Sequence, residues 1–184
     1  VTLQGDANGI NSAGNIIIIS PEQVILNNSQ ISSNTTSSGA AGNIVINTPN
    51  LVLSETTRIS ASTSGSGIAG DITFNITDTL TIDNSTVASR TTLGSGGRGG
   101  NINVFNAGAT NLVNGSSLSL NSDGQGAGGN LNLAAQALTL DNSNITATTL
   151  NSDGGDFTVN LSDYLLLRNG SLISTEAGTA QAGG

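Results

Sequence analysis

The sequence predicts an all-β protein, a right-handed parallel β-helix (a β-solenoid) of about six triangular coils with three short strands each. Three observations predict this fold. A motif of a glycine, an amide or acid, and a short apolar strand recurs every 26 to 30 residues. Apolar and polar residues alternate with a period of two, and no segment shows the i, i+3, i+4 spacing of a helix. Asn or Gly recurs at one point of nearly every repeat, as a sharp corner requires.

Each repeat begins at a marker glycine. "AGNIVI" at 41–46 and "GGNLNL" at 128–133 show the motif. The marker glycines are Gly14, Gly42, Gly70, Gly100, Gly129 and Gly155, and a seventh falls at Gly184. Because periods of this length are typical of solenoids, we predict one β-helical segment over residues 1–184, with coils that start at these glycines.

Three strands are predicted within each repeat. In the fifth repeat, 129–133, 137–140 and 144–147 each place apolar residues on one face. The matching inward pairs of the sixth repeat are Phe157 and Val159, Leu165 and Leu167, and Leu172 and Ser174. A triangle points these faces inward, and stacking pairs each strand with its copies about 4.8 Å above and below. Six coils would form a rod roughly 29 Å long.

The corners between second and third strands carry residues that tolerate positive φ. The middle residues of five corners are Asn28, Asn84, Gly115, Asn142 and Asn169. The second repeat departs from this pattern, because "SETT" (54–57) is one residue longer. We predict a bulge at that corner.

The fourth repeat does not fit the predicted register. "ATNLVNG" (109–115) places Asn111 at a position that is apolar elsewhere. The apolar residues at this position are Val24, Leu51, Leu80, Leu138 and Leu165. Either Asn111 turns inward and finds a hydrogen-bond partner, or a local shift brings Leu112 into the core.

An amide or acid follows every marker glycine. These residues are Asn15, Asn43, Asp71, Asn101, Asn130 and Asp156. They could form a row of calcium ligands, or they could bond backbone groups and one another. Because the two acids are never neighbours in the stack, no carboxylate cluster of the kind that calcium prefers is formed. We therefore predict a structural ladder and no metal site.

The composition excludes several classes of function. Cys and His are absent, so disulfides, thiolate zinc sites and Ser-His or Cys-His catalysis are excluded. Twelve acids stand against four bases, and this net charge of −8 argues against nucleic acid or anionic lipid as a partner. No apolar run is long enough to insert into a membrane as a helix. No residue is assigned to a cofactor.

Features of carbohydrate-active β-helices are weak in this chain. Such enzymes need paired carboxylates on one face, and no two acids recur in matching positions of adjacent coils. Asp141 falls near Arg168 in the predicted register, which indicates a surface ion pair. Phe105 and Tyr164 are predicted to face outward two coils apart, too scattered for an aromatic platform. The Gly-rich loops that close each coil vary in length, and variable loops are where binding residues usually lie.

The repeat pattern resembles a known family. "GGNLNLAAQALTLDNSNITATTLNSDGG" (128–155) is similar to the coils of filamentous-haemagglutinin-type exoproteins, which are secreted by the two-partner route and are abundant in cyanobacteria. The resemblance implies a right-handed β-helical rod, export through an outer-membrane transporter, and a role in adhesion, surface fibres or contact toxicity. The family's secretion domain has N-P-N-G and N-P-N-L tetrads. This chain has only "TPNL" (48–51), in phase with ordinary corners, so it corresponds to rod and no functional residue carries over.

The two ends of the chain fall in similar phases of the coil. Val1 and Leu3 match a third strand, at the positions of Leu118 and Leu120, and Gly184 falls on a marker glycine. Neither end carries an amphipathic helix or a charged cap, whereas solenoids normally cover their ends with a distinct unit. We therefore expect further coils beyond both termini, in a longer parent chain or through head-to-tail stacking of identical subunits. The absence of Met favours the longer parent chain.

A structural role is the function that these observations predict. The chain is expected to be a repeat segment of a secreted fibre or adhesin, extracellular or on the surface of a Gram-negative-type bacterium, and not an enzyme. Its expected partner is another solenoid coil, with cell-surface or matrix glycans as further candidates. The alternatives are a carbohydrate-binding β-helix module and a polysaccharide-active enzyme. An aromatic or amide-lined groove would favour the module, and a carboxylate pair in a groove would favour the enzyme.

Overall fold

The structure is a computed structural model that describes residues 1–92, 94–150 and 153–178. Within these residues there are fourteen strands and no helix. The strands are β1 (Thr2–Gln4), β2 (Ile16–Ile19), β3 (Gln23–Asn27), β4 (Gln30–Ser32), β5 (Ile44–Ser54), β6 (Arg58–Ser60), β7 (Ile72–Asp83), β8 (Thr86–Ala88), β9 (Ile102–Val113), β10 (Ser117–Ser119), β11 (Leu131–Asp141), β12 (Asn144–Thr149), β13 (Phe157–Arg168) and β14 (Leu172–Ala177).

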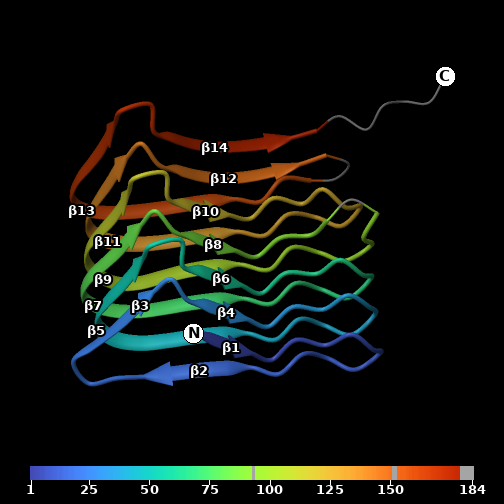
Figure 1. Cartoon of the computed structure of the whole chain (residues 1–184). Helices are drawn as coiled ribbons and strands as arrows, with labels where there is room; N and C mark the ends of the chain where they lie inside the picture. Colours follow the sequence, from blue (N-terminus) through green and yellow to red (C-terminus); the bar gives the residue numbers. More distant parts are fainter. Residues whose placement is uncertain (93, 151–152, 179–184) are drawn as a thin grey trace.

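The strands form two parallel sheets that run the length of the molecule (Figure 1). One sheet has the order β1-β4-β6-β8-β10-β12-β14, and the other has β13-β11-β9-β7-β5-β2 with β3 also paired to β5. Each strand except those at the two ends of the sheets thus lies between its equivalents from the preceding and following coils. This arrangement confirms the parallel β-solenoid of about six coils. Coils one to six are numbered from the marker glycines, and a row denotes residues at the same position in successive coils.

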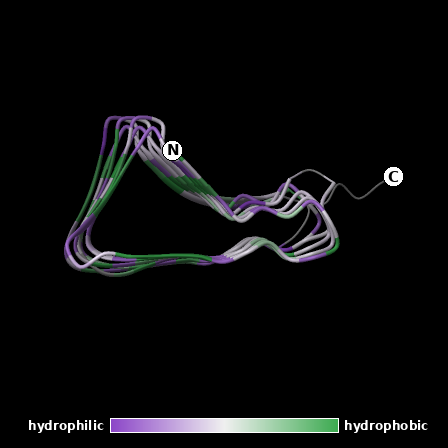
Figure 2. Cartoon of the chain, turned by 60° about the horizontal axis from the view of Figure 1, so that its bottom comes forward, coloured by the Kyte–Doolittle hydropathy of each residue, from purple (hydrophilic) through white to green (hydrophobic). Residues whose placement is uncertain are grey.

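The first and second sides of most coils form one bent strand, and not two strands as predicted. β5, β7, β9, β11 and β13 each cover 11 or 12 residues. Register shifts mark the bend, for example between Thr48 and Asn50 and between Ala135 and Ala137. The pairing between coils is interrupted at this bend and resumes on the second side. Figure 2 shows the resulting outlines, which are three-sided and narrow toward the loops.

The core consists of apolar rows along the axis. Ile102 pairs with Ile72 below it and Leu131 above it, as the sequence predicts, and all three are fully buried. The second side contributes rows such as Leu80 and Leu138, and the third side contributes Ile31, Ile59, Val87, Leu118 and Ile145. Burial of these aliphatic side chains is the main force that holds the coils together.

The marker glycines lie where stacked backbones approach closely. A Cβ atom on Gly42, Gly70, Gly100, Gly129 or Gly155 would overlap the carbonyl oxygen of the preceding marker glycine. The loops contain a second column of this kind, in which Cβ atoms on Gly67, Gly97 and Gly126 would overlap the carbonyl of the glycine one coil below. The loops are therefore stacked in order, which their variable length did not indicate.

The corners between the second and third sides alternate between two lengths. Short corners in coils one, three and five have one positive-φ residue, and long corners in coils two, four and six have two adjacent ones. The short-corner residues are Asn28, Asn84 and Asn142, and the long-corner pairs are Glu55 and Thr56, Asn114 and Gly115, and Asn169 and Gly170. The predicted positive φ values are confirmed. The prediction that only the second repeat is longer was wrong, because coils four and six share the extra residue.

The long corners explain the register of coils four and six. In coil four the second alternative holds, because Thr110 and not Asn111 occupies the row of Leu80 and Leu138, and Leu112 is fully buried in the core. The extra residue lies after the strand, at Asn114–Gly115, and not before it.

The same displacement occurs in coil six. The strand register places Ile173, and not Leu172, in the row of Ile145. Ile173 packs against the core, whereas Leu172 is largely exposed. The extra residue of the Asn169–Gly170 corner shifts the whole third strand by one position.

The N-terminal strand lies in the third side, as predicted, but two residues out of the predicted register. Leu3, and not Val1, pairs with Ile31 and so belongs to the row of Leu118. A shift of two residues leaves the alternation unchanged, so the sequence pattern did not reveal it. The predicted seventh marker, Gly184, lies outside the described residues.

Thr110 is a weak point of the core. It is fully buried in an otherwise apolar row, and its hydroxyl has no hydrogen-bond partner among the described residues. Because a buried hydroxyl without a partner keeps its full desolvation cost, we expect Thr110→Val to raise the free energy of unfolding by about 1–2 kcal/mol. Urea unfolding measures this change. A Thr110→Val protein less stable than the original would contradict the assignment.

Candidate functional site

The amide and acid ladder has a structural role, as predicted. The side-chain oxygen of Asn15 accepts a hydrogen bond from the Asn43 N–H at 2.8 Å, and the Oδ1 of Asn43 accepts one from Asp71 at 2.9 Å. The same bond joins every further step up to Asp156, at 2.7 to 2.9 Å. These oxygens satisfy backbone donors at a bend where the sheet ladder has ended.

A second ladder, which sequence analysis missed, lies at the corners after the second side. It consists of Ser29, Thr57, Ser85, Ser116, Ser143 and Ser171. The hydroxyl of Ser143 donates to the Asp141 carbonyl and accepts from the Ser116 N–H at 3.1 Å. The recurring Ser in "NNS", "DNS" and "NGS" was the available signal. Ser85, Ser116 and Ser143 are buried, so this ladder anchors the corners and offers no exposed group to a ligand.

No group of three or more acids that could hold a metal ion occurs in the part of the chain that the structure describes. The ladder oxygens are already hydrogen-bonded to backbone donors. We therefore expect a calcium chelator to change the melting temperature by less than about 2 °C, well within the shift that 1 kcal/mol causes in a chain of this length. Thermal unfolding with and without chelator measures it. A large fall in the melting temperature on chelation would show that the ladder binds metal.

The predicted ion pair between Asp141 and Arg168 is present on the surface. The Arg168 Nη2 atom lies 2.8 Å from Asp141 Oδ2, and Asn169 Nδ2 donates to Asp141 Oδ1 at 2.5 Å. The hydrogen bond from Asn169, followed by the nearby charge of Arg168, lowers the pKa of the Asp141 carboxyl. A carboxyl held ionised in this way is not suited to act as a general acid at neutral pH. The pair links the corners of coils five and six.

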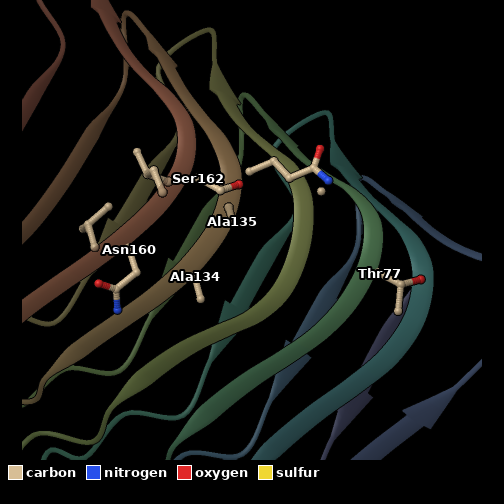
Figure 3. Close-up of a pocket in the computed structure, with 9 residues that line it drawn as sticks. Thr77, Ala134, Ala135, Asn160 and Ser162 are labelled. Atoms are coloured by element: carbon tan, nitrogen blue, oxygen red, sulfur yellow. The ribbon is translucent and has the colours of Figure 1, made fainter.

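A shallow groove of about 660 Å³ lies along the corner between the first and second sides, over coils three to six (Figure 3). None of its nine lining residues is charged. Its polar groups are the hydroxyls of Thr77 and Ser162 and the amides of Gln136 and Asn160. These groups are hydrogen-bond donors and acceptors without titratable chemistry.

The groove exists because coils four and five have small residues at this corner. Gly108, Ala134 and Ala135 lie between the larger side chains of coil three and coil six. A Cβ atom on Gly108 would overlap the backbone carbonyl of Asp78. The hollow at Gly108 is therefore a consequence of backbone packing.

Two exposed aromatic residues lie outside the lining of this groove. Phe105 directly follows Val104, whose partner Leu133 directly precedes the groove residue Ala134, and a register shift falls at this point. Tyr164 pairs with Ala137 and stands two residues after the groove residue Ser162. Phe105 is 40% exposed and Tyr164 49% exposed, and they belong to coils four and six, two coils apart, as predicted.

The two ends of the coil stack expose core rows. At the C-terminal end Leu165 is 48% exposed, although its row partner Leu138 is completely buried. At the N-terminal end a cavity of about 350 Å³ is lined mainly by apolar residues, among them Leu3, Ile18 and Leu26. Figure 1 shows β13 and β14 at one end and β1 and β2 at the other, and no strand of the described residues lies over either.

The chain was compared with protein-family models, with curated proteins and with solved structures, and none of these matched it. Among the described residues there is no helix with the length and apolar character needed to cross a membrane.

Proposed function

We propose that this chain is a structural repeat segment of a secreted extracellular fibre or adhesin, a rod that elongates through its end faces. The observation that carries the proposal is the state of those faces. Each one presents apolar core rows and the unpaired edges of parallel strands, which are surfaces that favour pairing with another strand. A further β-solenoid coil would cover the apolar rows and pair the strand edges at the same time.

The use of the polar side chains supports a structural role. The amide ladder and the corner hydroxyls bond to backbone groups of neighbouring coils, so they hold the rod together. One ion pair occurs among the described residues, between Asp141 and Arg168 on the surface. Because no carboxylate pair lies in the groove, the surface gives no support to a polysaccharide-active enzyme.

The extracellular assignment rests on composition and on the resemblance of the coils to filamentous-haemagglutinin-type exoproteins. A chain without Cys can cross a narrow transporter unfolded without forming incorrect disulfides. Its excess of acids reduces non-specific association in solution. An extracellular or cell-surface rod of a Gram-negative-type bacterium is therefore the proposed setting.

Sedimentation velocity over a range of protein concentrations tests this proposal, with negative-stain electron microscopy of the same samples. We expect species larger than the 18.2 kDa monomer, whose size grows with concentration, and rods of constant width. A compact 18 kDa species that does not change with concentration would contradict end-face pairing.

A second candidate function, binding of a neutral glycan, is favoured by the corner groove. Sugars are bound by amide and hydroxyl groups together with exposed aromatic rings. The groove supplies the amides and hydroxyls, and the exposed Tyr164 stands two residues beyond its lining residue Ser162. The uncharged lining and the net charge of −8 favour a neutral glycan over an anionic one.

A glycan array probed with the chain and with Tyr164→Ala tests this candidate. Binding of neutral glycans that the substitution weakens would support it. The matched control is Thr158→Ala, a substitution of another partly exposed residue of β13 outside the groove. Equal signals from all three proteins would count against the groove.

A further inference from the structure

We infer that the end face of coil six binds the end face of coil one of a second copy, in one defined register, with β14 of the first copy replacing β1 of the second. The C-terminal end face consists of the outer edges of β13 and β14 and the corner at Asn169–Gly170. The N-terminal end face consists of the outer edges of β2 and β3 and the corner at Asn28. This inference rests on the proposed function and specifies the partner that those faces fit.

The alternation of corner lengths is coupled to hydrogen bonds between coils. In coil two the Thr56 N–H, on the second residue of a long corner, donates to the carbonyl of Asn84 in the short corner above at 2.8 Å. In coil four the Gly115 N–H donates in the same way to the carbonyl of Asn142 at 2.8 Å. A long corner therefore directs one donor at the positive-φ asparagine of a short corner in the next coil.

The two end faces carry the halves of a third such bond. Coil six has a long corner, and no hydrogen bond from the Gly170 N–H occurs among the described residues. Coil one has a short corner, and the Asn28 carbonyl accepts no hydrogen bond within the same residues. Coil one placed on coil six continues the alternation of long and short corners and joins these two groups.

The amide ladder points to the same pairing. At every step the side-chain oxygen of one coil accepts the N–H of the matching residue in the next. At the C-terminal end the Asp156 carboxylate has no donor above it, and at the N-terminal end the Asn15 N–H has no acceptor within the described residues. The same placement brings the apolar rows together, with Leu165 next to Val24 of the second copy.

The third side requires an exchange of strands. β1 and β14 both belong to this side, so β2 and β3 of a second copy can reach β13 only if its β1 leaves the edge of β4. The paired segment continues past β1, because the Gly5 and Ala7 N–H groups donate to the carbonyls of Ser32 and Asn34 and Ala7 pairs with Thr35. Ile173 of β14 and Leu3 of β1 lie in the same row. The six residues of β14 therefore match the displaced residues 2–7 in length and place an apolar residue in the same position.

Disulfide trapping tests the register, because the chain has no Cys of its own. Ile25 and Leu166 lie in one outward row at opposite ends of the stack and are 58% and 39% exposed. Within one copy they are five coils apart, roughly 24 Å, but in the docked pair they are about 4.8 Å apart, a distance that a disulfide can span. We expect Ile25→Cys/Leu166→Cys to form covalent ladders on mild oxidation, seen on non-reducing gels.

Two matched variants control this experiment. Thr139→Cys/Leu166→Cys places the two cysteines on direct neighbours of one copy. This variant should form its disulfide within the monomer, which checks that cysteines in this row can be oxidised. Thr81→Cys/Leu166→Cys places one Cys in the middle of the stack and should give no ladders. Ladders of equal yield from this last variant would show non-specific oxidation and would overturn the inference.

Deletion of Gly170 tests the corner, and deletion of residues 1–7 tests the strand exchange. Deletion of Gly170 makes the corner of coil six short and removes its donor, so association should weaken roughly two- to tenfold, the effect of one hydrogen bond. Deletion of residues 1–7 removes β1 and the residues that continue its pairing to Thr35, and should strengthen association. The melting curve of each variant shows that the remaining coils are folded.

The outcomes separate the two proposals. Association that forms no Ile25–Leu166 ladders, or that is insensitive to both deletions, would overturn the register while leaving the rod proposal in place. Absence of association at every concentration would contradict both. Ladders that depend on both deletions in the expected directions would support the inferred contact.

Discussion

Ile102→Asp is expected to unfold the central coils, whereas Asn103→Asp, one residue further along, is expected to leave them folded. Ile102 is fully buried between Ile72 and Leu131. A carboxylate at this position would have apolar rows on both sides and no partner, which costs about 3 kcal/mol or more. For a chain with few charges and a single apolar core, this is a large part of the total stability.

Asn103 is the matched control because it faces outward in the same strand. Its Oδ1 accepts a hydrogen bond from Asn132 Nδ2 at 3.0 Å, which an aspartate oxygen can also accept. Its own donation to Thr73 is long, at 3.4 Å, so its loss costs little. Circular dichroism and urea unfolding of both variants measure the difference. Equal destabilisation by the two substitutions would refute the inward and outward assignment of β9.

Gly129→Ala is expected to have a comparable effect through sterics. A Cβ atom at this position would overlap the carbonyl oxygen of Gly100 and press on Leu120 Cδ2. Both backbones at this point belong to stacked coils, so neither can move without breaking the ladder on its other side. The cost should therefore exceed the ~1–3 kcal/mol that is typical of an overpacked core.

Gly154→Ala is the control for this substitution. The nearest atom to a Cβ on Gly154 is Ala177 Cβ at 3.7 Å, an ordinary van der Waals contact. The same chemical change should thus be tolerated at Gly154 and damaging at Gly129. Thermal unfolding of the two variants decides the point, and similar melting temperatures would show that the marker glycines are not required by backbone packing.

Some polar contacts repeat at every coil and others only at every second coil, and the two sets have different consequences for the rod. The amide ladder and the corner hydroxyls both repeat at every coil, so they set the direction in which one coil accepts the next. The corner bonds from Thr56 and Gly115 occur only at alternate steps. They make the two-coil pair the repeating unit of this rod and restrict which coil can follow which.

The period of the repeat, the inward rows of the first two sides and the asparagine corners were determined by the sequence alone. Ile72, Ile102 and Leu131 could be assigned because each follows a marker glycine at the same distance. Asn28, Asn84 and Asn142 could be assigned because few residues other than Gly and Asn adopt positive φ readily. The structural use of the amide ladder followed from the separation of its two acids.

The tertiary structure alone decided where each extra residue lies. It decided for Leu112 over Asn111 as the core residue of coil four, and it placed Ile173 in the core instead of Leu172, because the long corners follow the second side. An alternation of period two does not distinguish a shift of two residues, and it does not tell on which side of a strand an insertion falls. Those choices depend on which backbone groups of adjacent coils bond to each other, as does the groove lined by Thr77, Gln136 and Ser162.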